Sequence, residues 1–445
     1  MYIKRIKINN IKCLKNVNID LQRPDGTYAG FTVLAGRNGS GKSTLLRSIA
    51  LSIAGLRIDH SLQKSYTNWI TSGKKESQVE TELVIDKIDK FDKPEYYKNK
   101  NSLKVGLRWL SSEEKKEPRV SSLEFPDEQT KNIDEWLFDG PWSENLMGWF
   151  IAGYGPFRYL PSNALDTFKR DESILRINQL ISLFQENLPL SDGMSWLREI
   201  YLLRLENKPG FIDIEKGILA LLNDGLLPEG MNVIKFDSDG LWVSIDGKEL
   251  PLRELSDGFR TVVALIVDLS RQLYEAYGEF NVSKVNDHCE VLYPGVVLID
   301  ELDAHLHISW QQKIGFWLKS RFPKLQFIVT THSPFICQAA DPKGLIRLPA
   351  PGESRSVEHV PDDLFKAVTN GSADEAVVTE FFGLEHPHSH LSEQLQEELA
   401  ELEVRVIEGI ATPDQENDYH KLRAKLPNTQ KQLVEQALRK LQKLS

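Results

Sequence analysis

Gly36-Arg37-Asn38-Gly39-Ser40-Gly41-Lys42-Ser43 decides the fold, because it satisfies the G-x-x-x-x-G-K-[ST] spacing of a phosphate-binding loop. Residues 30–35 before it are apolar enough for a buried strand, and residues 44–51 after it carry apolar side chains at helical spacing. The glycines let the backbone approach phosphate oxygens, and the new helix adds unpaired N–H groups and the positive end of its dipole. The stretch therefore predicts a nucleoside triphosphate site.

Two side chains of this loop have expected roles of their own. Lys42 is expected to reach the β- and γ-phosphates, and Ser43 is expected to hold Mg²⁺. The residues predicted to bind the nucleotide are Gly36, Asn38, Gly39, Ser40, Gly41, Lys42, Ser43 and Thr44.

Composition narrows the class of protein. The 445 residues are 41% hydrophobic and 27% charged, which is typical of a globular chain long enough for a large core. The formal net charge of −10 argues against adhesion of the whole surface to nucleic acid or anionic membrane, although a local basic groove stays open. Three scattered cysteines predict neither disulfides nor a zinc site. With no signal peptide or membrane span in the sequence, we expect a cytoplasmic protein.

The first half of the chain is predicted to contain mainly strands. Alternating patterns favour strands over residues 2–8, 17–21, 76–86 and 102–110, with a connecting corner at 10–16. Lys12 and Lys15 in that corner either pack against a nucleotide base or ribose or are solvated. The charged residues 86–101 are expected to be an exposed insertion or a mobile loop, and residues 111–129 are again polar.

A Gly/Pro-punctuated loop ends the apolar run Trp149–Arg158, and two interpretations of it stay open. It either senses the nucleotide or is a tight turn with Arg158 solvated. Residues 170–225 then have helical periodicity, which predicts a compact helical insertion. Residues 232–250 return to strands, with a hairpin turn at Asp246-Gly247.

Two further motifs carry chemistry. Leu255-Ser256-Asp257-Gly258-Phe259-Arg260 opens a helix predicted over 261–277, where an N-terminal hydroxyl and N–H groups can bind an anion. Gly295–Ile299 is a continuous apolar strand that ends in Asp300-Glu301. Asp300 is suited to Mg²⁺ and Glu301 to activating a water molecule.

Residues 302–307 are expected to continue into a helix. The strand 327–331 ends at His332, which is well placed to touch a γ-phosphate.

The order of these motifs resembles the ABC-type ATPases, in the branch of the SMC, RecF, RecN and OLD-like proteins, over about residues 1–350. The resemblance implies Walker A at Gly36–Thr44, the signature motif at Leu255–Arg260, Walker B at Val296–Glu301, a D-loop around Asp303 and a switch histidine at His332. It implies ATP and Mg²⁺ as ligands, with Lys42, Glu301 and His332 catalytic and Ser43 and Asp300 on the metal. It also implies a head-to-tail dimer in which Ser256 and Gly258 contact ATP on the partner.

Three departures from the family pattern stand out. The signature reads Leu-Ser-Asp-Gly-Phe, and Lys42 and Asp300 lie 258 positions apart. The glutamine loop has no clear counterpart, with Gln78 and the Gly153–Arg158 loop as candidates. The phrases at 300–307 and 331–334 most resemble compact bacterial AAA-type defence ATPases, such as PtuA of the Septu system and the retron-associated ATPases.

The C-terminal hundred residues differ in pattern. Residues 391–445 predict two or three amphipathic helices with Leu391, Leu395, Leu399 and Leu402 on one side, either a solvated appendage or a docking element. His386, His388 and His390 favour a surface loop over a metal site. The expected divisions are 1–165 and 231–350 for the two parts of the ATPase head, 166–230 for the helical insertion and 351–445 for a helical C-terminal region.

The prediction is thus an α/β fold, an ABC-type P-loop ATPase head with a mixed β-sheet, an inserted helical subdomain and a helical C-terminal appendage. The resemblance implies an ATP-hydrolysing homodimer or higher oligomer that regulates or docks a partner nuclease in anti-phage defence, with nucleic acid possible as a ligand and no membrane partner. The alternative is a stand-alone DNA-binding repair or recombination ATPase.

Overall fold

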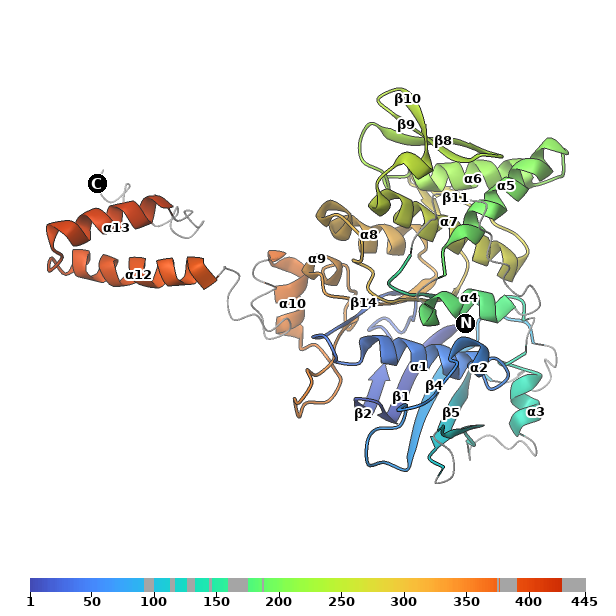
Figure 1. Cartoon of the computed structure of the whole chain (residues 1–445). Coiled ribbons are helices and arrows are strands. Elements are labelled where there is room, and N and C mark those ends of the chain that lie inside the picture. The colour runs from blue at the N-terminus through green and yellow to red at the C-terminus, as the bar shows by residue number, and fades with distance from the viewer. Residues whose placement is uncertain are drawn as a thin grey trace. The chain divides into compact units, whose positions relative to one another are not determined.

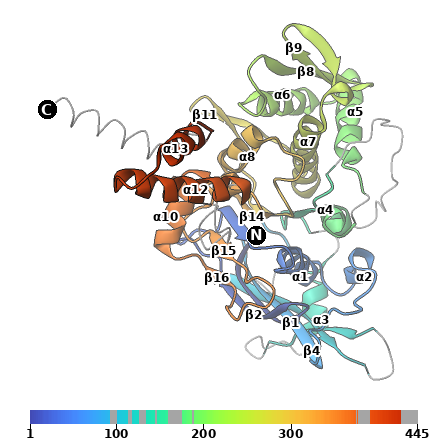
Figure 2. The same cartoon turned by 60° about the vertical axis from the view of Figure 1, so that its left-hand side comes forward.

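A computed structural model describes residues 1–91, 100–112, 117–125, 133–143, 146–158, 175–185, 188–373, 376 and 390–425. The chain forms two compact units, residues 1–382 and 383–445. The first unit contains the sheets and most of the helices (Figures 1 and 2).

A six-stranded sheet of order β16-β15-β3-β14-β13-β7 lies at the centre of the first unit. All pairs are parallel except the terminal pair β15–β16. Its strands are β3 (Gly30–Ala35), β7 (Ile151–Tyr154), β13 (Gly295–Ile299), β14 (Leu325–Thr331), β15 (Leu345–Arg347) and β16 (Glu358–His359).

This sheet is buried on both faces, which explains its apolar strands. In β13, Val297 and Ile299 face one hydrophobic core, whereas Val296 and Leu298 face the other. The predicted strand before the phosphate loop and the predicted strand before Asp300 are both confirmed.

A second sheet is antiparallel, with order β2-β1-β4-β5-β6. Helix α1 (Lys42–Ala54) packs between it and the central sheet (Figure 1). The strands are β1 (Tyr2–Ile11), β2 (Leu14–Asp20), β4 (Glu76–Val84), β5 (Ser102–Leu110) and β6 (Arg119–Ser122). Helices α2 (Asp59–Leu62) and α3 (Ile133–Phe138) belong to the same part of the chain.

Helices α5 (Ser191–Leu205), α6 (Phe211–Asn223) and α7 (Asp257–Tyr277) cover the other face of the central sheet, whereas α4 (Leu175–Phe184) packs on the same side as α1. These helices confirm the helical pattern predicted within residues 170–225 and the helix predicted after the signature. A small sheet, β8 (Met231–Asp237), β9 (Gly240–Ile245) and β10 (Lys248–Pro251), contains the predicted hairpin turn at Asp246-Gly247. Figures 1 and 2 both show β8 and β9 at the end of this unit opposite β1 and β4.

The remaining elements of the first unit are short, apart from α8 (Ile308–Arg321) and α10 (Asp362–Asn370). They are the 3-10 helix Leu252–Glu254, β11 (Ser283–Val285), β12 (His288–Glu290) and α9 (Pro334–Cys337). The second unit contains α12 (His390–Ile407) and α13 (Pro413–Lys425), which pack through Leu399, Tyr419 and Leu422 with Leu395 and Leu402 alongside. Two of the predicted C-terminal helices are therefore confirmed.

Several sequence-based boundaries were wrong. The corner expected at 10–16 is only a two-residue turn, since β1 continues to Ile11 and β2 begins at Leu14. Strand β6 lies inside the polar stretch 111–129, where no strand was predicted. Residues 302–307 lead directly into a helix, α8, which begins at Ile308, but they are not helical themselves, because Glu301 and His305 have positive φ angles (48° and 65°). His386, His388 and the side chains of His390 and Leu391 lie outside the described residues.

Candidate functional site: a nucleotide site at the carboxyl ends of the parallel strands

The predicted site residues outside the signature lie at one edge of the central sheet. The phosphate loop follows β3, Asp300 and Glu301 follow β13, and His332 follows β14. Strand β14 lies between β3 and β13, so it separates the loop from the two acids by one strand. Because parallel strands end at the same edge, residues that are 258 positions apart in the chain become neighbours in space.

The phosphate loop has the backbone that its glycines permit. Gly39 and Gly41 have φ angles of 80° and 94°, and a Cβ on Gly41 would lie 2.7 Å from the sulfur of Cys13. A side chain at Gly41 is therefore excluded by both conformation and space. The Ser40 hydroxyl is buried and has no hydrogen-bond partner among the described residues, so it is available to a ligand.

The Lys42 side chain folds back onto this loop. Its Nζ donates to the carbonyl oxygens of Gly36 and Arg37 at 2.7 and 3.2 Å, and only 7% of the residue is exposed. Burial lowers the pKa of Lys42, and the negative charges of Asp300, Glu301 and Asp303 oppose that shift. The ammonium is thus placed where phosphates would pack on the loop, with the three acids of the next motif close by.

The turn after β13 is fixed by Thr330 on the neighbouring strand. Its Oγ1 donates to Asp300 Oδ1 at 2.6 Å and accepts from the N–H of Glu301 at 2.7 Å. Asp300 is 2% exposed. One hydroxyl therefore orients the carboxylate expected on the metal and the backbone of the expected base.

Thr331 and His332 make the corresponding contacts with the D-loop. Asp303 Oδ1 accepts from Thr331 Oγ1 at 2.5 Å and from the N–H of His332 at 3.3 Å. The His332 ring is exposed, yet partial desolvation and then the Lys42 charge lower its pKa, while Asp303, Glu301 and Asp300 raise it. Sequence reasoning missed both threonines, whose only signal was their place at the end of a buried strand before His332.

Arg158 is buried, which excludes the interpretation of a solvated turn. Its guanidinium donates to backbone carbonyls at the turn after β13, and burial lowers its pKa to about 10. The Gly153–Arg158 loop therefore lies beside the acids. The other glutamine-loop candidate, Gln78, lies in β4 between Asn9 and Arg108 of the antiparallel sheet.

The signature residues are placed differently. Ser256 is the exposed N-cap residue of α7, and its side chain makes no capping hydrogen bond. A Cβ on Gly258 would lie 3.0 Å from the carbonyl oxygen of His305, and the ring of Phe259 packs edge-on against Trp310 at 5.1 Å. Among the described residues these contacts lead to the turn after β13 and to α8. Within the described ranges, no hydrogen bond or ion pair joins Ser256 or Gly258 to the chain's own Lys42.

A family model matches residues 31–338, from β3 through α9, and it is described as "AAA domain, putative AbiEii toxin, Type IV TA system". The chain belongs to this AAA-domain family. The match includes the phosphate loop, the signature, the acidic turn and His332.

Curated relatives of this AAA-domain protein agree with the predicted resemblance. It is 29% identical over 340 residues to the Septu protein PtuA of Bacillus mycoides, covering 75% of this chain and 38% of that one. The Retron Vc95 probable ATPase of Vibrio cholerae is 24% identical, covering 75% of this chain and 71% of that one. The Retron Ec83 probable ATPase of Escherichia coli is 42% identical over 105 residues, covering 24% of this chain and 18% of that one.

These matches confirm the predicted grouping with ATPases of the Septu and retron type. The chain spans less than half the length of the PtuA proteins that it matches. Among solved structures, an SMC head bound to the C-winged helix domain of ScpA gives a TM-score of 0.47 at 17% identity, covering 82% of this chain and 98% of that one. The α/β fold itself follows from the sheets described above.

A pocket of about 580 Å³ adjoins the phosphate loop of the AAA-domain protein. It is lined by Gly39 and Ser40, by residues 13–17 of the β1–β2 turn and β2, and by the segment 349–357. Lys15 lines it, whereas Lys12 lies over the ring of Trp69 at 5.0 Å. Of the two lysines considered for the base or ribose, only Lys15 lies in this pocket.

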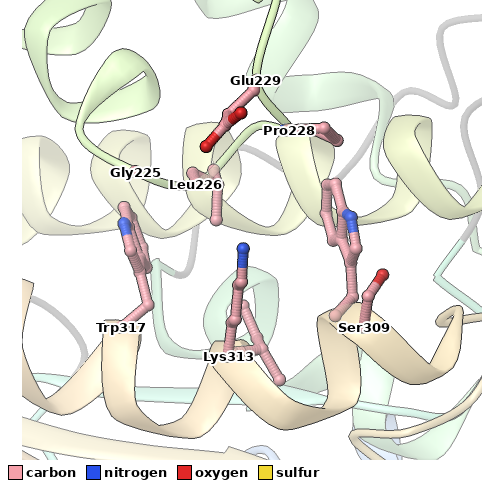
Figure 3. A pocket seen from close by; sticks show the side chains of 9 residues that line it. Gly225, Leu226, Pro228, Glu229, Ser309, Lys313 and Trp317 are labelled. Atoms are coloured by element: carbon pink, nitrogen blue, oxygen red, sulfur yellow. The ribbon is translucent and has the colours of Figure 1, made fainter.

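A second pocket, of about 410 Å³, lies between α8 and residues 225–229. Figure 3 shows Lys313 projecting from α8 toward this segment, with Trp317 to one side and Glu229 opposite. Trp310 lines the pocket and also contacts Phe259, so the pocket adjoins the signature motif.

The described residues contain no group of three or more His, Cys, Asp or Glu side chains arranged to hold a metal ion. No helix in the same ranges is long and apolar enough to cross a membrane. A Mg²⁺ ion at Ser43 and Asp300 would take its remaining oxygen ligands from phosphate and water, as this ion commonly does.

Proposed function

We propose that this protein binds ATP with Mg²⁺ and hydrolyses it slowly, closing as a head-to-tail dimer around the nucleotide. The observation that supports this most is the meeting of Lys42, Asp300, Glu301 and His332 at the ends of three adjacent strands. A phosphate loop alone binds a nucleotide, but hydrolysis also needs a group for the metal and a base for water.

The roles follow from chemistry and position. Lys42 and the N–H groups of the loop bind the phosphates, and the buried Ser40 hydroxyl can donate to one of them. Ser43 and Asp300 would hold Mg²⁺, which when bound neutralises charge on the phosphate oxygens. The Thr330 hydroxyl orients Asp300 for this task. Glu301 accepts a proton from the attacking water, and His332 contacts the γ-phosphate.

The exposure of the signature supports the dimer. Ser256 and Asp257 are exposed at the start of α7, where the hydroxyl and the N–H groups can bind an anion from outside the chain. A second copy related by a two-fold axis would then bring its exposed signature to the phosphate loop of this chain and complete each ATP site.

A partner nuclease and a role in anti-phage defence are the finer parts of the proposal. The names of the relatives, a Septu protein and retron ATPases, support them together with the sequence resemblance. Copurification of a nuclease with the chain expressed from its native operon would support the partner. A steep fall in the DNA affinity of the isolated protein with rising salt would instead favour the DNA-repair alternative.

The deciding experiment is Glu301→Gln. We expect ATP to bind with unchanged affinity, hydrolysis to fall by about 10²-fold or more, and a dimer to accumulate with ATP, as measured by phosphate release and light scattering. Glu254→Gln, an exposed glutamate before the signature, is the matched control and should hydrolyse ATP normally. An unchanged rate in Glu301→Gln would refute the general-base assignment.

A further inference from the structure

Arg158 makes an unusual set of contacts with the turn that contains Glu301. Its Nη1 donates to the carbonyl oxygens of Gly155 at 2.6 Å and Asp300 at 2.8 Å. Its Nη2 donates to the carbonyl oxygens of Glu301 at 2.9 Å and Leu302 at 3.3 Å. One side chain thus binds three successive carbonyls after β13.

The backbone at Glu301 needs such support. Its φ of 48° lies in the left-handed region, which a glutamate rarely adopts and which persists only where the surroundings impose it. Its N–H is held by Thr330 from β14 and its carbonyl by Arg158 from the loop after β7. Hydrogen bonds from β14 and from the loop after β7 therefore hold the N–H and the carbonyl group of Glu301.

A second arginine shows that burial alone does not explain this arrangement. Arg176 is 4% exposed, against 2% for Arg158, and its Nη1 also donates to backbone carbonyls, those of Ile53 at 3.2 Å and Pro141 at 2.5 Å. Those carbonyls belong to α1 and to the segment before β7. The two arginines are buried to a similar extent, but their guanidinium groups bind backbone carbonyls in different segments.

We propose that Arg158 is a positioning residue for hydrolysis, because it fixes the left-handed turn that aims the Glu301 carboxylate at the attacking water. This inference rests on the proposed function, in which Glu301 is the general base. A displacement of about 1 Å at a reacting group can cost about 10²-fold in rate, so loss of this support should affect the chemical step more than binding.

The test compares Arg158→Gln with Arg176→Gln, the equally buried control. We expect Arg158→Gln to lower the single-turnover rate of ATP hydrolysis by about 10²-fold while the Kd for ATP changes less than about threefold. Arg176→Gln should lower the Tm but keep the rate within about threefold of the wild type. Arg158→Lys, which keeps the charge and can reach fewer carbonyls, should recover part of the rate.

Several outcomes would overturn the inference. One is a parallel loss of ATP affinity and rate in Arg158→Gln, because that is a general structural defect. An equal loss of hydrolysis rate in Arg158→Gln and Arg176→Gln would also indicate a general structural defect. If Arg158→Gln does not fold, Arg158→Lys decides by the same comparison of rate with Kd, and a wild-type rate there overturns the proposal.

The double variant Arg158→Gln/Glu301→Gln separates this inference from the function on which it rests. If Arg158 acts through Glu301, the double variant hydrolyses ATP no more slowly than Glu301→Gln alone. A further loss of about 10²-fold would show an independent role and overturn the inference. A normal rate in Glu301→Gln contradicts the proposed function, whereas a slow Glu301→Gln with a normal Arg158→Gln contradicts only the positioning role.

Discussion

The hydroxyl of Tyr154 donates to Oδ2 of Asp268 at 3.1 Å and so joins the last residue of β7 to the middle of α7. The carbonyl of the same tyrosine accepts the N–H of Asp300 at 2.8 Å. Gln272 donates to the same Asp268 oxygen at 2.6 Å, and Arg271 donates to the other at 3.1 and 2.9 Å. Tyr154 therefore contacts both the helix that begins at the signature and the turn expected to hold Mg²⁺.

The first prediction concerns the stability of this network. Tyr154→Phe should lower the free energy of unfolding by about 1–3 kcal/mol, because the hydroxyl's hydrogen bonds to Asp268 and from Gln272 are both lost while Gln272 still donates to Asp268. Asp268→Ala should cost about 3–5 kcal/mol, because it leaves the buried Arg271 guanidinium without this partner. Urea denaturation measures both. Tyr28→Phe, whose ring stacks on Tyr2, is the control and should change little.

The second prediction concerns the backbone of the phosphate loop. Gly41→Ala should abolish ATP binding, because its Cβ would clash with Cys13 and Leu14 at a φ of 94°. Gly210→Ala, at a φ of 86° with nothing within 4 Å, carries the same conformational strain in open space. It should lower stability but bind ATP normally in a calorimetric titration. Normal affinity in Gly41→Ala would contradict the loop assignment.

The third prediction concerns the ionisation of His332 in the nucleotide-free protein. Its pKa should lie below 6.5, chiefly because burial disfavours the imidazolium and additionally because Lys42 is close. Lys42→Ala should therefore raise the pKa of His332, measured by NMR titration of the imidazole signals. Lys15→Ala should leave it unchanged.

The lowered pKa of His332 also determines how this residue changes the free energy of unfolding with pH. Between the folded pKa and 6.5 the unfolded chain binds more protons at this site than the folded chain does. The contribution of His332 to stability is therefore complete above pH 6.5 and is lost as the pH falls through the folded pKa. His332→Ala should reduce the slope of stability against pH in that window.

The fourth prediction tests the shared ATP site. Ser256→Arg should prevent the ATP-dependent dimer in the Glu301→Gln background, because a bulky side chain at an exposed helix start blocks close approach of a second copy. ATP binding to the monomer should persist. Ser238→Arg, at an exposed serine in the β8–β9 turn, should dimerise normally. Normal dimerisation of Ser256→Arg would argue against the proposed arrangement.

The amino-acid pattern predicted the local parts of the site well. The strand–loop–helix around residues 36–43, the apolar strand before Asp300 and the serine at the start of α7 each depend on neighbours within a few residues, and all three conformations are confirmed. It predicted turns less well, since the left-handed residues Glu301 and His305 interrupt a stretch whose composition favours a helix. The pattern also did not decide whether Arg158 is solvated or belongs to a loop at the nucleotide site.

The sequence by itself thus determined which loop is expected to bind phosphate and which strands are buried on both faces, because both follow from local spacing and hydrophobicity. Only the tertiary structure decided how the distant motifs combine. Strand β14 enters between β3 and β13, so Thr330 reaches Asp300 and Glu301. The carbonyls of the same turn bury the Arg158 guanidinium. These contacts join residues from separate strands, and no local pattern encodes the order in which strands pair.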